Sequence, residues 1–176
     1  MNSVVTNGPS GPGNEGSQDA VKVRIGESRL ARTPCRLTTA AIGSCIAVCL
    51  YDRARKTGCL CHSLLPSPSD QKGERSARYT TDAILMMVDL LKAEGALPAN
   101  LEAKLVGGAS LFGSFEGSET LSIGVRNAEA ARSCLMNLGI SIVAEDVGGG
   151  YGRSVEFSTE DGVVTVRSAR AGERIL

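Results

Sequence analysis

The chain has 176 residues and a mass of 18.3 kDa, which suits one domain with a sizeable core. Its 19 basic and 19 acidic residues leave a formal net charge of zero, which disfavours a general binder of nucleic-acid backbones. No apolar run reaches the ~18 residues of a membrane helix, and the N-terminus has neither the basic nor the apolar segment of a signal peptide. We therefore expect a cytoplasmic protein that binds no nucleic acid and does not insert into a membrane.

The composition predicts a core built from aliphatic side chains and cysteine. There are six cysteines, 21 glycines, no tryptophan and only 3% aromatic residues. In a cytoplasmic chain of this size the cysteines should stay reduced. We expect most of them to act as small hydrophobic residues.

The first 19 residues differ in composition from the rest of the chain. They are rich in Gly, Pro, Ser and Asn, and only three of them are apolar. Because so little apolar area cannot offset the entropy cost of ordering, we expect residues 1–19 to form a disordered tail and residues 20–176 to form the domain. A second polar stretch, at 66–78, is expected to be a surface loop.

Apolar patterning predicts a series of strands after the tail. Residues 21–25 alternate between apolar and polar side chains, which is typical of a half-buried strand. Two apolar runs, at 46–51 and 58–65, predict a hairpin around a polar turn at 52–55. Further strands are predicted at 104–106, 122–125, 140–146, 154–158 and 163–167.

Two amphipathic segments predict helices. Thr81 is expected to cap the first helix, which runs to about Glu94, and Asn127 is expected to cap the second, which ends at Leu138. A glycine follows each predicted helix end, as is common at helix C-termini. Together with the strands, these helices predict an α/β or α+β domain.

The single histidine lies opposite a cysteine in the predicted hairpin. If residues 52–55 form the tip, facing residues have numbers that add up to 107, so Cys45 faces His62. Their Cβ atoms would then be about 4.5–5.5 Å apart, close enough for a thiol and an imidazole to exchange a proton. Such a pair can act as a thiol nucleophile with its general base, and a packed pair without a catalytic role stays open as the alternative.

Zinc binding is a further alternative for the same residues. Cys45, Cys49 and His62 share one face of the predicted hairpin, whereas Cys59 and Cys61 project from the other face because side chains alternate along a strand. Cys59 and Cys61 are also separated by one residue rather than by the two residues of common zinc sites. The pattern therefore favours a site without a metal.

Several segments occur in an order and at a spacing that resemble one protein family. They are IGSCIAVCLYD at 42–52, HSLLP at 62–66, KLVGGA at 104–109, IGVRN at 123–127 and AEDVGG at 144–149. Over roughly residues 21–168 the chain resembles the CheD family, the chemoreceptor glutamine deamidases. One departure is Val125, where the family often has Glu.

The resemblance implies a cysteine hydrolase, a protein-glutamine glutaminase, that converts glutamines of chemoreceptors to glutamates and releases ammonia. Cys45 would be the nucleophile and His62 the general base and acid. Thr39 would orient the imidazole by hydrogen bonding, with the adjacent Thr38 as the alternative for this third position.

The resemblance also implies a fold and partners. The fold would be a single-domain α/β sandwich of β-sheet with two main helices, like the catalytic domain of cytotoxic necrotising factor toxins. No metal or organic cofactor would be needed, and chemoreceptors would be the partners. A second function is a binding module that regulates the CheC phosphatase, although the presence of Cys45, His62 and Thr39 favours the enzyme.

Overall fold

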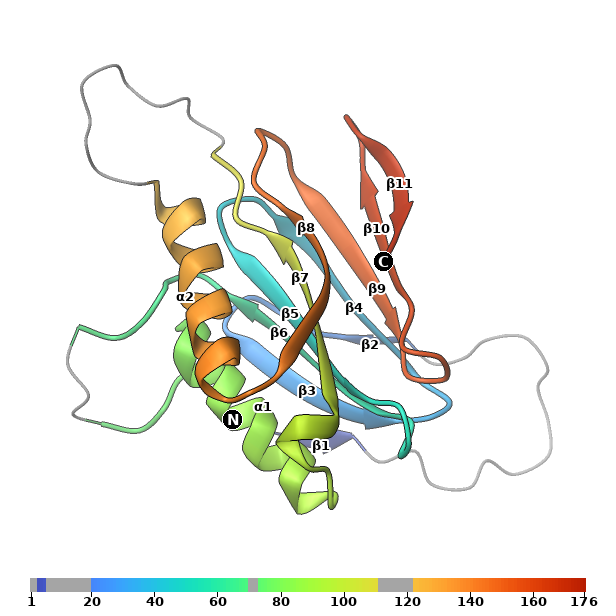
Figure 1. Ribbon diagram of the computed structural model, residues 1–176. Helices are drawn as coiled ribbons and strands as arrows, with labels where there is room; N and C mark the ends of the chain where they lie inside the picture. The colour runs from blue at the N-terminus through green and yellow to red at the C-terminus, as the bar shows by residue number, and fades with distance from the viewer. Residues whose placement is uncertain (1–2, 6–19, 70–72, 111–121) are drawn as a thin grey trace.

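The computed structural model describes residues 3–5, 20–69, 73–110 and 122–176. In these ranges the chain forms two α-helices, a short 3-10 helix and two β-sheets (Figure 1). The two sheets face each other, and both α-helices cover the outer face of one sheet. The predicted α/β architecture of β-sheet with two main helices is confirmed.

The larger sheet has six strands. In spatial order they are β1 (Ser3–Val5), β3 (Glu27–Arg32), β6 (Thr57–Ser63), β5 (Ile46–Asp52), β7 (Leu101–Gly107) and β8 (Ser141–Val147). The β1–β3 and β7–β8 pairs are parallel, and the other neighbours are antiparallel. Strands β5 and β6 are buried along their whole length, which explains their mainly apolar sequences, because both faces of the sheet are covered at its centre.

The smaller sheet has five strands. In spatial order they are β11 (Gly172–Ile175), β10 (Val164–Ser168), β9 (Arg153–Ser158), β4 (Arg36–Ile42) and β2 (Ala20–Lys22). Buried and half-buried residues alternate along β9, as expected for a strand with one face in the core. Strand β4 alternates in the same way as far as Thr39, after which its pairing with β9 shifts at a bulge.

Helices α1 (Thr80–Ala93) and α2 (Ile123–Asn137) lie side by side on the larger sheet, and the 3-10 helix η1 (Pro98–Asn100) precedes β7 (Figure 1). Their buried faces are aliphatic, with Ile84 and Leu91 in α1 and Leu135 in α2. Within the described ranges, neither α-helix has the length and apolar character needed to cross a membrane.

Both helices begin earlier than predicted. Helix α1 follows Tyr79, not Thr81, and no side chain caps it. Helix α2 is capped by Ser122, whose hydroxyl accepts a hydrogen bond from the backbone N–H three residues later at 3.4 Å. Asn127 therefore lies inside α2, and the strand predicted at 122–125 is wrong. An alternation over only four residues does not distinguish a strand from the first turn of a helix.

Two apolar cores lie on the two faces of the larger sheet. The outer core lies between this sheet and the helices, and the inner core lies between the two sheets. Cys59 and Cys61 belong to the outer core, whereas Cys49 belongs to the inner core and Cys45 packs against it. The predicted division of these cysteines between two faces is confirmed.

Several strands lie where none was predicted. Strands β3, β4 and β11 were missed because their sequences are rich in polar and charged residues and lack a regular apolar alternation. Strand β1 lies inside the stretch expected to be a disordered tail and pairs in parallel with β3. Residues 1–2 and 6–19 lie outside the described residues, so the tail prediction for them stays a prediction. The described part of the predicted loop at 66–78 contains no helix or strand.

Candidate active site

The turn of the β5–β6 hairpin lies further along the chain than predicted. The ladder continues to Asp52 and Thr57, and the four residues between them form the turn. Lys56 adopts a positive φ of 49°, and Asp52 Oδ1 accepts a hydrogen bond from the N–H of Arg55 at 3.0 Å. These two local features place the turn one residue later than the polar composition alone indicated, which shifts the pairing of the two strands by two residues.

The prediction that Cys45 directly faces His62 is therefore wrong, because Ala47 is the residue paired with His62. Cys45 precedes Ala47 by two positions and lies on the same face of the sheet. A register shift of two residues keeps the face, whereas a shift of one residue would have reversed it. Cys45 and His62 are thus diagonal neighbours, a relation in which backbone positions are typically about 7–8 Å apart.

The His62 imidazole is held between the two sheets. It is fully buried, and its Nδ1 lies 2.8 Å from the hydroxyl oxygen of Thr39 on β4. Burial lowers the pKa of His62 to about 4, so the ring is neutral at pH 7. Its Nε2 has no hydrogen-bond partner among the described residues, so this nitrogen is available to exchange a proton.

Thr39 reaches His62 from the opposite sheet. Its side chain is 3% exposed and points inward, whereas the neighbouring Thr38 is half-buried on the other face of β4. The bulge that follows Thr39 includes Ala41 at a φ of 60°, and such bulges re-aim side chains and the chain beyond them. The hydrogen bond supports Thr39 over Thr38 as the orienting residue, and the orienting role itself stays a prediction.

The segment that carries Cys45 is anchored by a glycine loop after β7. The carbonyl oxygen of Cys45 accepts a hydrogen bond from Gly108 N–H at 2.7 Å, and that of Gly43 accepts one from Ala109 N–H at 2.9 Å. A side chain at Gly107 would collide with the Cys45 carbonyl, and Gly107 also has a φ of 122°. The loop therefore needs glycine to approach the cysteine segment this closely.

The surroundings of the Cys45 thiol favour its protonated form. Its side chain is half-buried, and burial raises the pKa of the thiol. Because His62 is neutral and carries a free Nε2, the site combines a thiol with an imidazole base rather than a preformed ion pair. Such a site forms its thiolate when the thiol proton moves to the imidazole.

The other cysteines on these strands lie in different surroundings. Cys49, Cys59 and Cys61 are fully buried, and burial raises the pKa of each thiol, for Cys61 to about 11. All six cysteines of the chain are free thiols. Among the described residues, no three His, Cys, Asp or Glu side chains are arranged to hold a metal ion.

A buried ion pair joins the two sheets at the same end of the sandwich. Arg153, at the start of β9, donates a hydrogen bond from Nη2 to Asp146 Oδ1 on β8 at 2.9 Å. The Arg153 guanidinium also lies over the ring of Tyr151, with 4.1 Å to the ring centre. Because Arg153 pairs with Ile42 of β4, this ion pair fixes the sheets close to the Cys45 segment.

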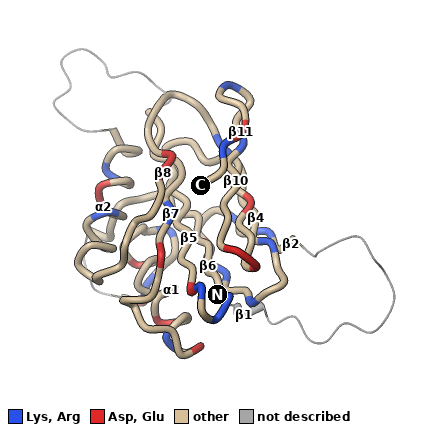
Figure 2. The backbone as a smooth tube through the Cα atoms, turned by 45° about the vertical axis from the view of Figure 1, so that its right-hand side comes forward, with Lys and Arg blue, Asp and Glu red and all other residues tan. Residues whose placement is uncertain are grey.

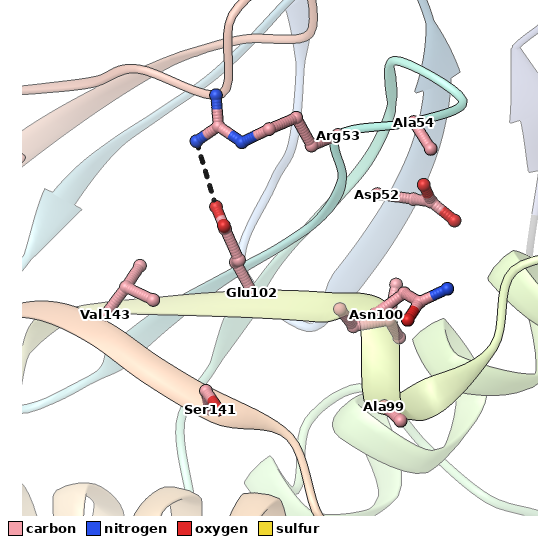
Figure 3. Close-up of a pocket in the computed structure, with 9 residues that line it drawn as sticks. Asp52, Arg53, Ala54, Ala99, Asn100, Glu102, Ser141 and Val143 are labelled. Carbon is pink, nitrogen blue, oxygen red and sulfur yellow. Dashed lines mark hydrogen bonds and ion pairs between the residues drawn. The ribbon is translucent and has the colours of Figure 1, made fainter.

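A hollow of about 600 Å³ lies at the opposite end of β5, next to the hairpin turn (Figure 3). An ion pair between Arg53 and Glu102, 3.2 Å long, crosses it, and Val143 and Ser141 line its far side. Its lining contains neither cysteine nor histidine, so its size does not make it the site of thiol chemistry. Figure 2 shows basic and acidic residues interspersed over the described chain, in keeping with the balanced composition.

One functional candidate was missed by sequence reasoning. Asn127, expected as a helix cap, is fully buried, and its side-chain amide binds the carbonyl oxygens of Ser44 and Leu64. The signal that could have revealed it is a polar residue at the same helical spacing as Ala131 and Leu135 on the apolar face of α2.

Comparison with known proteins gives consistent sequence matches. Residues 64–168 match a family model described as CheD chemotactic sensory transduction. A probable chemoreceptor glutamine deamidase CheD 2 of Geobacter metallireducens is 44% identical over 150 residues, which is 84% of this chain and 93% of the relative. The chemoreceptor glutamine deamidase CheD of Thermotoga maritima is 39% identical over 87% of this chain and 94% of its own. The chemoreceptor glutamine deamidase CheD of Halalkalibacterium halodurans is 36% identical over 89% of this chain and 98% of its own.

Similarity to solved structures is weaker. The hypothetical protein YfiH of Bacillus licheniformis has a TM-score of 0.45 and 20% identity, and covers 67% of this chain and 49% of its own. A Neisseria meningitidis protein of family-model DUF152 has a TM-score of 0.44 and 13% identity, and the match covers 74% of this chain and 62% of the other. These values support no conclusion about function. The family model matches more than half of the chain, and the relatives are similar over nearly their whole length. These two findings show that the chain belongs to the CheD family.

Proposed function

We propose that this protein deamidates glutamine side chains of chemoreceptors in the cytoplasm, with Cys45 as nucleophile, His62 as base and acid, and Thr39 as the orienting residue. Membership of the CheD family supports the reaction and the substrate class. The observation that carries the residue assignment is the 2.8 Å contact between Thr39 and His62 Nδ1, which leaves Nε2 free on the face that Cys45 shares.

The first half of the reaction forms a thioester. In the Nδ1–H tautomer, His62 donates its hydrogen bond to the Thr39 hydroxyl, 2.8 Å away, and the lone pair of Nε2 accepts the proton of the Cys45 thiol. The thiolate then attacks the carboxamide carbon of the substrate, and its electron pair forms the new C–S bond while the C=O pair moves to oxygen. When the tetrahedral intermediate collapses, the C–N bond breaks and His62 returns the proton to the leaving ammonia.

The second half hydrolyses the thioester. His62, now neutral, accepts a proton from a water molecule as its oxygen attacks the thioester carbon. The C–S bond breaks, and His62 protonates the departing thiolate, which restores the thiol of Cys45. The product is glutamate, and the sequence consumes one water and releases one ammonia without a metal or an organic cofactor.

Two finer points rest on the family resemblance alone. One is a fold like that of the cytotoxic necrotising factor catalytic domain, and the other is binding to the CheC phosphatase. The second point is a separate function, because a binding module needs neither Cys45 nor His62. It predicts that Cys45→Ala changes the rate of the CheC phosphatase as much as the wild-type protein does.

The test of the proposed activity uses the wild-type protein and a cytoplasmic chemoreceptor fragment that contains glutamine. We expect ammonia release to match the amide-to-acid mass change at specific glutamines in peptide mass spectrometry. His62→Gln serves as the matched variant, and its fragments should keep their glutamines. Absence of both ammonia and the mass change with the wild-type protein, across fragments from several chemoreceptors, would contradict the proposal.

A further inference from the structure

Asn127 connects the two segments that carry the proposed nucleophile and base. It lies in the second turn of α2 and is fully buried. Its Nδ2 donates one hydrogen bond to the Ser44 carbonyl oxygen at 2.8 Å and one to the Leu64 carbonyl oxygen at 2.9 Å. Both partners are carbonyls, so only the amide nitrogen, with its two protons, suits this position.

These two hydrogen bonds lie where the hairpin ladder ends. The last pair of β5 and β6 is Ile46 with Ser63, so Cys45 and Leu64 lie just beyond the ladder. No ladder hydrogen bond fixes the distance between the segments at this point. The side-chain amide of Asn127 links the two segments beyond the ladder, because it binds the carbonyl oxygens of both Ser44 and Leu64.

The start of α2 is itself fixed against the glycine loop that anchors Cys45. A Cβ atom built on Gly124 would lie 2.5 Å from the carbonyl oxygen of Ala109, and one built on Gly108 would lie 2.8 Å from that of Gly124. The helix and the loop therefore touch through bare backbone. This close packing leaves the Asn127 amide little freedom to move relative to the Cys45 segment.

The Ser44 hydrogen bond also sets the direction of the Cys45 N–H. In a planar trans peptide the N–H points opposite to the C=O of the preceding residue. Because the Ser44 carbonyl points to Asn127, the Cys45 N–H points away from α2. This N–H lies beside the Cys45 thiol, whose pKa it lowers in opposition to the larger effect of burial. A donor at this place can bind the oxyanion that forms when the thiolate attacks.

The choice of an amide here has a cost. Asn127 Oδ1 is buried without a hydrogen-bond partner among the described residues, and an orphaned buried acceptor is destabilising. The two hydrogen bonds that the amide donates to Ser44 and Leu64 offset this destabilisation. We propose that Asn127 is a positioning residue, which sets the separation of Cys45 and His62 and aims the Cys45 N–H at the developing oxyanion. This inference deepens the proposed function and rests on it.

The test compares three variants of the full chain. Asn127→Ala removes the donors and some packing without adding charge, whereas Asn127→Asp keeps the shape and replaces the two N–H donors with a carboxyl oxygen, which adds a negative charge when ionised. Ala131→Gly, in the same helix and equally buried, is the matched control for a loss of stability without a change at the site. We expect both Asn127 variants to lower kcat by ~10–100-fold with KM within about twofold. Ala131→Gly should lower the melting temperature and keep kcat within about twofold.

A second measurement keeps the inference testable apart from deamidation. The rate of Cys45 alkylation by iodoacetamide, followed from pH 6 to 10 by peptide mass spectrometry, reports the thiolate fraction without a receptor substrate. If the Cys45 N–H is no longer directed at the thiol, both Asn127→Asp and the uncharged Asn127→Ala should be alkylated about 3–10-fold more slowly at neutral pH, and Ala131→Gly at the wild-type rate. Wild-type kcat and alkylation in Asn127→Ala, or an equal loss in Ala131→Gly, would overturn the inference. A wild-type protein that releases no ammonia would contradict the proposed function, and the alkylation comparison would still decide the role of Asn127.

Discussion

The two ends of the β5–β6 hairpin are held in different ways. At the turn end, Asp52 binds the N–H and the guanidinium of Arg55, three residues away in the sequence. At the open end, the segments around Cys45 and His62 are held by Asn127, which is 83 residues from Ser44 and 63 residues from Leu64. The turn end, which the Arg53–Glu102 ion pair also ties to β7, carries no candidate chemistry, and the open end carries all of it.

This difference has a physical reason. A turn needs only to reverse the chain, and short-range hydrogen bonds are sufficient for that. A reactive pair needs a fixed separation and orientation, and a displacement of about 1 Å can cost a hundredfold in rate. Contacts from β4, the loop after β7 and α2 all converge on the open end, which makes it far more constrained than a hairpin end would otherwise be.

Removal of the imidazole at the open end should lower activity more than any change to Thr39 or Gly58. We expect His62→Gln to lower kcat/KM by ~10³-fold, because His62 is the only histidine of the chain and its Nε2 is the base assigned to the thiol proton. The melting temperature should change little in comparison. Activity within tenfold of wild type on a chemoreceptor fragment would show that His62 is not the base.

The hydroxyl that orients the imidazole should have a smaller effect. Thr39→Val keeps the shape and removes the hydrogen bond to Nδ1, so we expect kcat to fall by about tenfold, the usual cost of one lost buried partner. Thr39→Ser should stay close to wild type because it retains a hydroxyl. Thr38→Val is the control for the neighbouring position, and a larger loss in that variant would contradict the assignment of Thr39.

A change near the turn end should separate stability from activity. Gly58 pairs with Tyr51, and a Cβ atom added there would lie 2.6 Å from the buried ring of Phe157. We expect Gly58→Ala to lower the free energy of unfolding by about 2 kcal/mol, as overpacked cores do. Chemical denaturation measures this loss, and kcat of the folded variant should remain at the wild-type value. A large fall in kcat without loss of stability would show that the two ends are not independent.

The open end should also give a pH dependence of stability. The folded-state pKa of His62, about 4, lies below its ordinary value of 6.5. Between these values the unfolded chain binds a proton that the folded protein does not, so stability falls as the pH falls from 6.5 to 4. The slope contributed by His62 is at most about 1.4 kcal/mol per pH unit. The free energy of unfolding, measured by urea denaturation between pH 4 and 6.5, should fall more steeply with falling pH in the wild type than in His62→Gln. Equal pH slopes in the two proteins would show that the pKa of His62 is not lowered by folding.

The sequence was sufficient for the parts of the fold that depend on local pattern. Both central strands and both helices were predicted, and the faces of four cysteines were right because the side-chain period of a strand is two. The register was wrong by two residues because a positive φ at Lys56 is not encoded by a glycine or an asparagine there. The face survived this error only because the shift was even.

The parts that could not be predicted depend on contacts between distant segments. Asn127 looks like a helix cap in the sequence, and only the packing of α2 on the glycine loop shows that it binds Ser44 and Leu64. Strand β4 was missed because its sequence carries little apolar pattern, although the family resemblance singled out Thr39 within it. The bulge between Thr39 and Ile42 has no sequence signal at all.

The measurement that tests the account most directly compares two cysteines of one strand face. Cys45 is half-buried at the open end, whereas Cys49 is fully buried four residues further along in the inner core. Ammonia release from a chemoreceptor fragment should be lost in Cys45→Ala, by at least ~10³-fold, and should remain within about twofold of wild type in Cys49→Ala. Near-normal release by a folded Cys45→Ala, or its loss in Cys49→Ala alone, would contradict the central claim that Cys45 is the nucleophile.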